Sequence, residues 1–342
     1  MRKAWVRLIL ILLLMVVFLY FFFRSVEWRE VFSYLTGIDI KIFILVILLT
    51  PVHLATRAFR WKYLLMHGKK DVKFSNMFAG NAVGFTVTFI FPGRLGELVK
   101  PLYLAQKEKM SKGFVIGTVV VERTFDLFTM SFLLGLFLLS KPIYPSFFQG
   151  KKEAFSNLYL WGIVAVSFAT VLLIFSLSLY FFKEKTLSFV RFILRLFPHK
   201  ISEKVLELSQ EFIQGLKFFH SIGNLLLYIL LSFVVWLSII FYYWVFFLSY
   251  DVSLPFFFLF PYVFLVMVGA SIPTPGMVGG FHSFSKFGLT SLFRIDINLA
   301  VAMTIVIHAL QLIVTCLIGY VILWKEGISL FQLKKLGENE EK

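Results

Sequence analysis

Long apolar runs recur along this 342-residue chain, and they constrain its fold more than any other feature. A transmembrane helix needs about 20 predominantly apolar residues. Six runs approach or exceed that length: 4–23, 40–58, 114–139, 157–182, 222–248 and 297–324. Because 59% of the residues are hydrophobic and only 15% are charged, most of the chain must face something other than water. We expect an all-α polytopic membrane protein that forms one integral membrane domain over residues 1–342.

The first run starts like a secretory signal, since Arg2, Lys3 and Arg7 make its beginning basic. Its apolar stretch continues to Phe23, however, and no small-residue cleavage site precedes Arg24. We therefore expect a retained N-terminal anchor helix over residues 1–24.

The chain is basic, with 34 Lys and Arg residues against 19 Asp and Glu residues. In a membrane protein this excess lies on the loops that flank the spans, where it sets orientation and attracts anionic lipids, so we expect no nucleic-acid partner. Residues 183–220 alternate apolar and charged side chains, which is typical of a cytoplasmic amphipathic segment on the membrane surface. Cys316 is the single cysteine, and no HxxxH or HExxH spacing occurs, so neither a metal site nor a cofactor is expected.

Two weaker apolar runs, 75–91 and 255–272, end at Pro-Gly pairs, and the distribution of basic residues bears on whether they cross the membrane. If both cross, Lys and Arg divide 16 to 16 between the two sides. If both turn back, the division becomes 25 inside to 7 outside, as the positive-inside rule expects. The sequence therefore favours six full spans and two re-entrant hairpins in the cytoplasmic membrane, with both termini cytoplasmic.

The two breaks share a spacing that indicates an inverted repeat. Pro92-Gly93-x-x-Gly96 in the first unit (40–139) matches Pro275-Gly276-x-x-Gly279 in the second (222–324), and the predicted hairpins open to opposite sides. The helix that follows each break also carries one polar stripe. Paired interrupted segments in corresponding halves are typical of transporters whose site lies near the membrane midplane.

Glu122, Arg123 and Asp126 lie in one apolar helix, where each charge costs about 3 kcal/mol at the bilayer centre. They must face protein or water. One interpretation is a structural ion pair from Arg123 to Asp126, and the other is contact with a substrate head group. Arg94 and Glu97, just after the first break, are either a local pair or part of an anion site.

The remaining candidates are polar residues with weaker support. Asn81 lies in the first half-helix, and His282, Lys286 and His308 lie in the second unit. Cations and an indole near the second span and the first hairpin are most simply interfacial anchors, with lipid phosphate binding as the alternative. These interfacial candidates are Arg57, Arg60, Trp61 and Lys100.

At these residues the sequence resembles the flippase-like transmembrane domain of the lysylphosphatidylglycerol synthetase/flippase family. The resemblance spans nearly the whole chain and rests on four elements: Arg57-x-x-Arg60-Trp61, Pro92-Gly93-Arg94-x-Gly96-Glu97-x-x-Lys100-Pro101, Glu122-Arg123-x-x-Asp126 and Pro273-x-Pro275-Gly276-x-x-Gly279. It implies translocation of a lipid. The family's second loop often has a carboxylate where this chain has His282. Because the chain ends eighteen residues after Trp324, we expect a stand-alone member without aminoacyl transfer.

The sequence thus predicts a lipid flippase, or a transporter of a lipid-linked intermediate, that is not an enzyme. Its expected partners are membrane lipids, and a homo-oligomer or a lipid-synthesising partner enzyme stays open. One alternative is a membrane transferase acting on polyprenyl phosphate, with Glu97 or Asp126 as base and Arg94 holding phosphate. A second alternative is a non-transporting scaffold for a partner enzyme, which would use residues 183–220.

Overall fold

The computed structural model describes residues 2–149, 182–194 and 221–330, parts of 156–174, and positions 202, 203, 206, 332 and 333. These residues are helical or in turns, and no strand occurs among them, which confirms the all-α class. Three helices are long and apolar enough to cross a membrane: α3 (Ile40–Leu65), α11 (Ile222–Leu248) and α14 (Ile297–Glu326). A fourth candidate span combines residues 9–23 of α1 (Arg2–Phe23) with α2 (Trp28–Thr36), bent by 83°.

Helix α6 (Lys112–Leu139) has 28 residues and carries the three ionisable residues Glu122, Arg123 and Asp126. At 1.5 Å per residue it is about 42 Å long, which exceeds the thickness of a hydrocarbon core. Glu122, Arg123 and Asp126 lie near the middle of this helix, far from either end, and therefore need partners within the protein.

The first Pro-Gly break produces a tight helical hairpin. Helix α4 (Phe74–Ile90) ends before the 3₁₀ turn η1 (Pro92–Arg94), and α5 (Gly96–Glu108) returns along it. At the open end, the Lys73 amide donates to Glu108 Oε1 at 3.1 Å. Near the tip, a Cβ on Gly96 would overlap the Gly84 carbonyl oxygen, so the two backbones can cross this closely only because glycine has no side chain.

The second break has the same form. Helix α12 (Leu259–Ser271) is followed by the turn η4 (Pro275–Met277), the short helix α13 (Gly280–Phe287) and the π-helical turn η5 (Gly288–Leu292). A Cβ on Gly269 would lie 2.6 Å from the Gly280 carbonyl oxygen. Further from the tip, the hydroxyls of Tyr262 and Ser285 are 2.9 Å apart. The chain therefore reverses direction at both predicted breaks.

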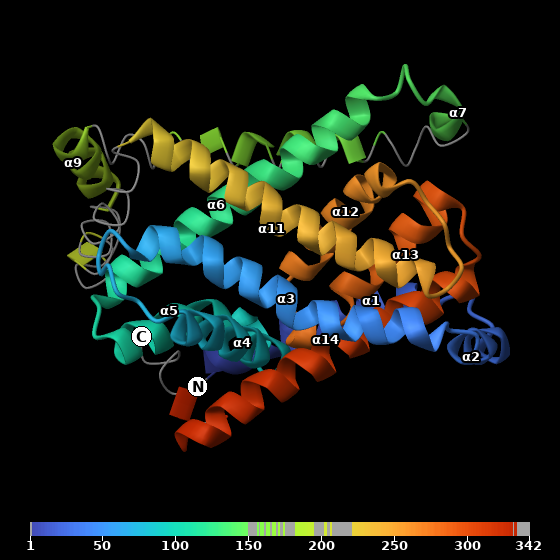
Figure 1. The fold of residues 1–342 in the computed structure, drawn as a ribbon, viewed down its shortest axis with the longest axis horizontal. Coiled ribbons are helices and arrows are strands. Elements are labelled where there is room, and N and C mark those ends of the chain that lie inside the picture. Colours follow the sequence, from blue (N-terminus) through green and yellow to red (C-terminus); the bar gives the residue numbers. More distant parts are fainter. Residues whose placement is uncertain are drawn as a thin grey trace.

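The tips of the two hairpins meet inside the molecule. A Cβ on Gly276 would lie 3.1 Å from the Phe89 carbonyl oxygen, and Arg94 Nη1 donates to the Ser271 carbonyl oxygen at 3.5 Å. Figure 1 shows the α4–α5 hairpin in the same half of the molecule as the start of α1, the end of α14 and α9 (Lys183–Leu194), whereas α2, α7 (Pro145–Phe148) and α13 lie in the other half. The hairpins thus enter the bundle from opposite ends.

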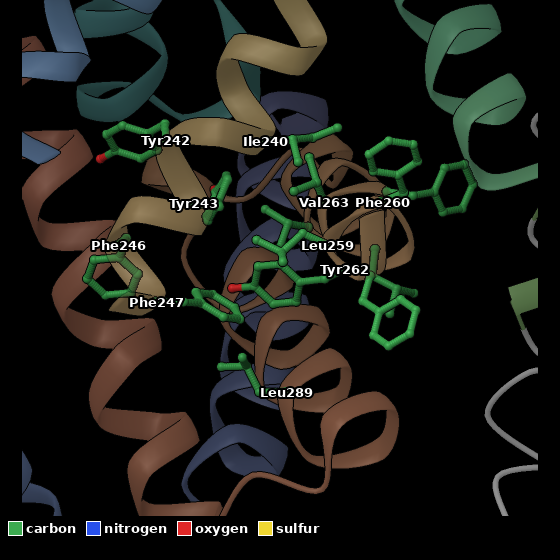
Figure 2. Close-up of a cluster of buried hydrophobic side chains, with 14 of the residues drawn as sticks. Ile240, Tyr242, Tyr243, Phe246, Phe247, Leu259, Phe260, Tyr262, Val263 and Leu289 are labelled. Carbon is green, nitrogen blue, oxygen red and sulfur yellow. The ribbon is translucent and has the colours of Figure 1, made fainter. Parts of the chain in front are cut away.

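An aromatic core holds the second hairpin against α11. The ring centroid of Tyr262 lies 5.6 Å from that of Tyr243 and 5.1 Å from that of Phe247, both in edge-to-face geometry. Figure 2 shows these three rings together with Leu259 and Val263 between α11 and α12. Such aromatic pairs each add about 0.5–1.5 kcal/mol beyond the burial of their area.

Helix α2 is an element that the sequence analysis did not predict. It packs against the start of α14, where Asn298 accepts a hydrogen bond from the Glu27 amide at 2.9 Å and donates to Glu30 Oε2 at 2.5 Å. With nine residues, it is too short to register as a membrane segment.

Two predicted segments lie only partly within the described residues. Of the predicted span 157–182 the structure describes separate helical stretches, and Leu158 is buried in the aromatic core. Of the predicted amphipathic segment 183–220 it describes chiefly α9, on which Leu187 is buried and Phe189 and Phe192 are exposed.

Candidate functional site

Four ionised side chains form a buried network between α3, α5 and α6. Arg60 donates to Asp126 Oδ1 at 2.7 Å and to Glu122 Oε1 at 3.3 Å. Lys100 Nζ lies 2.5 Å from Glu122 Oε2. None of these four side chains is more than 6% exposed, so their charges are balanced by one another and not by water. We refer to Arg60, Lys100, Glu122 and Asp126 as the inner quartet.

Local sequence explains why these groups meet. Glu122 and Asp126 are four residues apart on α6 and therefore share one helix face, which α3 and α5 cover. Lys100 reaches Glu122 because α5 lies tightly on α4, where a Cβ on Gly84 would approach Lys100 Cβ to 2.7 Å. The close glycine crossing in the hairpin thus positions a charged residue of the site.

Neutral and aromatic groups complete the inner quartet. Trp236 Nε1 donates to Asp126 Oδ1 at 2.9 Å, and Ser232 Oγ accepts from Arg60 at 3.3 Å. The ammonium of Lys100 lies 4.2 Å from the ring centroid of Trp61, a cation–π distance. Buried charges are tolerated when they are paired and hydrogen-bonded in this way.

A second layer of charge lies next to the quartet and is less balanced. Arg123 Nη1 is 3.2 Å from Asp126 Oδ2, while its Nε is 3.4 Å from Glu97 Oε2. Arg94 Nη2 is 3.3 Å from Glu97 Oε1, and Arg57 Nη1 is 3.7 Å from Asp126 Oδ2. We call the three arginines of this layer, Arg57, Arg94 and Arg123, the outer arginines.

The whole cluster carries a positive charge. Among the described residues it contains five basic side chains, Arg57, Arg60, Arg94, Lys100 and Arg123, and three acidic ones, Glu97, Glu122 and Asp126. Five minus three leaves a net charge of +2 when all eight are ionised. An excess of positive charge at a largely desolvated cluster favours the binding of an anion.

A cavity of about 470 Å³ opens beside the outer arginines. All three arginines line it together with Asp126, and Gln311 and His53 contribute further polar groups. The rest of its wall is mainly aromatic and aliphatic, contributed by Phe85, Leu127, Phe168, Trp236, Ile239, Val263, Val266 and Met267, among others. The cavity therefore has a cationic part and an apolar part, as an amphiphilic ligand requires.

Five of the nine predicted substrate-binding residues lie together in this cluster: Arg94, Glu97, Glu122, Arg123 and Asp126. The other four do not join them. Asn81 donates to the Met77 carbonyl oxygen within α4 at 3.2 Å. Lys286 Nζ donates to the Phe22 and Arg24 carbonyl oxygens at 2.6 and 3.1 Å, so it caps the end of α1.

The two histidines form a separate pair at the second hairpin. Their ring centroids are 4.6 Å apart, and His308 Nε2 lies 2.9 Å from the Gly276 carbonyl oxygen. His282 Nδ1 accepts a hydrogen bond from the Gly279 amide at 3.4 Å. His308 thus binds the backbone of the turn η4 and His282 binds the backbone at the start of α13, and neither side chain lines the cavity.

The four residues expected at the membrane interface are instead buried in the protein. Arg60 and Trp61 have no exposed surface, and Lys100 and Arg57 are 5% and 8% exposed. Burial corrects the interfacial expectation because α4, α6 and α11 cover the part of α3 that carries Arg57, Arg60 and Trp61. Lys100 lies on α5 and faces Glu122 on α6. The alternative, phosphate binding, stays a proposal for Arg57, which lines the cavity.

The sequence analysis did not identify Ser232, Trp236 and Gln311 as site residues. Ser232 and Trp236 are four positions apart in an otherwise apolar helix, a spacing that places two hydrogen-bonding side chains on one face. That signal was available in the sequence, but it does not indicate which helix the face meets. Among the described residues, no group of three His, Cys, Asp or Glu side chains could hold a metal ion.

The chain is similar in sequence to known membrane proteins. Residues 5–319 match the family described as the lysylphosphatidylglycerol synthase TM region. The chain is also similar to the UPF0104 membrane protein of Methanocaldococcus jannaschii, with 25% identity over 281 residues that cover 77% of this chain and 78% of the relative.

Proposed function

This chain belongs to the family of the lysylphosphatidylglycerol synthase transmembrane region and is a multi-pass membrane protein, and from that membership we propose that it moves a polar-headed lipid across the cytoplasmic membrane. The lipid would be a phospholipid or a lipid-linked intermediate. Its head group would pass through the cavity beside the outer arginines, while its acyl chains stay against the apolar wall. The observation that carries this proposal is a cluster of net charge +2, buried at its centre and partly exposed at Arg94, Glu97 and Arg123, beside a cavity with an apolar wall.

The proposed topology has six full spans and two re-entrant hairpins, with both termini in the cytoplasm. The distribution of basic residues, 25 to 7, supports this orientation. So does the meeting of the two hairpin tips near the middle of the helices, because irregular backbone at membrane depth is tolerated where protein or a wet cavity surrounds it. The hairpins would open to opposite sides and bring two half-helices to one central site.

Backbone geometry supports an inverted repeat of residues 40–139 and 222–324. Gly93 (φ 81°, ψ 13°) and Gly276 (φ 60°, ψ 16°) share a left-handed conformation, and each is followed by a non-glycine residue in the same region, Arg94 (φ 57°) and Met277 (φ 59°). Two successive left-handed residues after a proline are an unusual combination. Its occurrence in both turns favours a repeated unit, and rocking of one unit against the other would expose the site alternately.

The transferase alternative has less support. Glu97 and Asp126 each lie within 3.4 Å of arginine nitrogens, and Asp126 also accepts from Trp236. A general base needs a lone pair directed at its substrate, and each of these carboxylates instead faces two or more arginines. We therefore propose that the protein is not an enzyme. The scaffold alternative depends on residues 183–220, of which chiefly α9 is described.

Reconstitution into vesicles tests the proposal. Fluorescent phospholipid would be placed in both leaflets, and the loss of inner-leaflet protection against a membrane-impermeant quencher would be followed. We expect Arg94→Ala and Glu122→Gln to slow lipid movement at least tenfold, because each changes the charge at the cavity. Glu184→Gln, an isosteric change at an exposed position of α9, is the matched control and should move lipid at the wild-type rate. Unchanged movement in both site variants would remove these residues from the mechanism.

A further inference from the structure

The charges of the cluster separate into a balanced part and an excess. In the inner quartet, two basic side chains face two carboxylates, and its ion pairs include two contacts of 2.5 and 2.7 Å. Around it, the three outer arginines share a single additional carboxylate, that of Glu97. The entire excess of two positive charges therefore lies on the layer that lines the cavity.

The outer arginines also hold hydrogen-bond donors that have no partner among the described residues. Arg57 is more than nine-tenths buried, yet its Nε and Nη1 make no hydrogen bond there. Arg94 Nε is likewise buried without a partner in the described part of the chain. A buried guanidinium left with open N–H groups is costly unless a ligand accepts from it.

Aromatic rings hold one of these donors in place. The guanidinium carbon of Arg57 lies 5.5 Å from the ring centroid of Phe85 and 5.7 Å from that of Trp236. Both rings also line the cavity. Arg57 is thus fixed between apolar surfaces, with its free N–H groups available to an oxyanion beside them.

We propose that the preferred substrate is a lipid whose head group ends in a phosphate monoester. This inference rests on the proposed function and names its substrate class. A phosphate monoester carries about −1.5 to −2 charges at neutral pH and offers three acceptor oxygens. Two negative charges cancel the excess of +2, and the oxygens match the fork-like donors of the arginines. The apolar wall of the cavity distinguishes a lipid from free phosphate.

Net charge then ranks the common head groups. With a monoester of charge −2 the site becomes neutral, whereas an anionic diester of charge −1 leaves +1. A zwitterionic head group leaves the excess of +2 unchanged, and lysylphosphatidylglycerol, an aminoacylated lipid of charge +1, raises it to +3. The structure therefore orders affinity as phosphatidic acid, then phosphatidylglycerol, then phosphatidylethanolamine, with the aminoacylated lipid weakest.

Equilibrium binding to the purified full chain in a neutral detergent tests this order, with native mass spectrometry as the readout. The probes are these four lipids with matched acyl chains, and inorganic phosphate alone. We expect phosphatidic acid to bind at least about tenfold more tightly than phosphatidylethanolamine, as one or two charge-assisted hydrogen bonds provide. Inorganic phosphate should bind weakly, since it cannot use the apolar wall.

Variants separate charge from folding. Arg57→Gln should weaken the binding of phosphatidic acid about tenfold or more. Gln311→Glu is isosteric and lines the same cavity, so it lowers the excess charge to +1 without disturbing the ion pairs and should act in the same direction. Lys62→Gln changes a cation on the same helix outside the cluster and should leave binding unchanged.

The outcomes are distinct. The inference is overturned if all four lipids bind with equal affinity, or if the zwitterionic or aminoacylated lipid binds more tightly than phosphatidic acid. Unchanged binding of phosphatidic acid in both cavity variants would also overturn it. If inorganic phosphate binds as tightly as phosphatidic acid, the site does not select a lipid. Selective binding of phosphatidic acid without any movement of lipid in vesicles would uphold the inference and remove the proposed function. Lipid movement that does not depend on head-group charge would uphold the proposed function and overturn the inference about the substrate.

Discussion

Arg60 and Asp126 are 66 positions apart in sequence, and their side chains form a 2.7 Å contact with almost no exposed surface. The contact ties α3 to α6 at the centre of the molecule. Because Asp126 also faces Arg57 and Arg123, it is the carboxylate on which the most positive charge converges.

Loss of this carboxylate should cost more than loss of its partner. Asp126→Asn raises the net charge of the cluster from +2 to +3, whereas Arg60→Gln lowers it to +1. Removing one member of a buried ion pair typically costs about 3–5 kcal/mol. We expect Asp126→Asn to fall in that range and Arg60→Gln below it, measured by thermal unfolding in detergent. Asp251→Asn, at an exposed position with φ 56° that asparagine tolerates, is the control. Equal losses in the two site variants would contradict the charge argument.

The glycine crossing of the first hairpin should not tolerate a methyl group. Gly96→Ala places Cβ on the Gly84 carbonyl oxygen and against Thr88, so the hairpin must open. We expect loss of the folded protein, or a destabilisation of about 3 kcal/mol or more. Gly135→Ala in α6 is the matched control, because nothing lies within 4 Å of its Cβ and alanine favours a helix by about 1 kcal/mol. Fluorescence-detected size-exclusion chromatography compares the two, and a stable, monodisperse Gly96→Ala protein would contradict this packing.

The native Arg94 should lower the stability of the protein while it supports lipid movement. Its φ of 57° lies in the left-handed region, which costs a non-glycine residue about 1–2 kcal/mol. Arg94→Gly should therefore keep or raise the melting temperature while lipid movement falls, since the cavity loses an arginine. Lys109→Gly has a similar starting φ of 53° and lies outside the cluster, so it should raise stability without slowing movement. A loss of movement in Lys109→Gly equal to that in Arg94→Gly would show that the backbone, and not the charge, matters.

The open end of the first hairpin should respond to acid. Burial raises the pKa of Glu108, but hydrogen bonds from Lys69, Asn76 and the Lys73 amide outweigh it and hold the pKa below its ordinary value. A depressed pKa contributes stability that is present above the unfolded value of about 4.3 and is lost as pH falls through the folded value.

Glu108→Gln should therefore lower the melting temperature at about pH 7, and the difference from wild type should shrink as the pH falls below about 4.3. Differential scanning fluorimetry across this range measures it, with Glu184→Gln on the exposed face of α9 as the control. A constant difference between the Glu108→Gln and wild-type curves would show that the carboxylate charge contributes nothing.

Accessibility labelling tests the proposed topology. In a Cys316→Ala background, the cysteines of Lys70→Cys and Lys109→Cys should react with an impermeant thiol reagent from the same side of the membrane, because the α4–α5 hairpin returns to its starting end. The cysteine of Lys141→Cys should react from the other side, since the 28-residue helix α6 lies between positions 109 and 141. Labelling of Lys109 and Lys141 from one side would rule out the re-entrant hairpin.

The sequence alone determined which segments are apolar, where the chain must break and which helix carries charges. Pro92-Gly93 and Pro275-Gly276 predict turns, because proline cannot continue a helix and glycine adopts backbone angles that other residues avoid. Glu122 and Asp126 predict a buried polar face, because residues four positions apart lie on the same face of a helix. These are local effects, and a local pattern is enough to predict them.

Tertiary structure decided which groups meet. Arg57 and Arg60 near the end of an apolar run could equally have reached toward the membrane surface, and they are buried only because α4, α6 and α11 pack over them. His308 and Lys286 were weaker site candidates than Arg94 in the sequence, and in the structure they bind the backbone of η4 and the end of α1. A charge in an apolar helix must find a partner, but the partner comes from a helix distant in sequence, and only the packing of the two hairpins selects it.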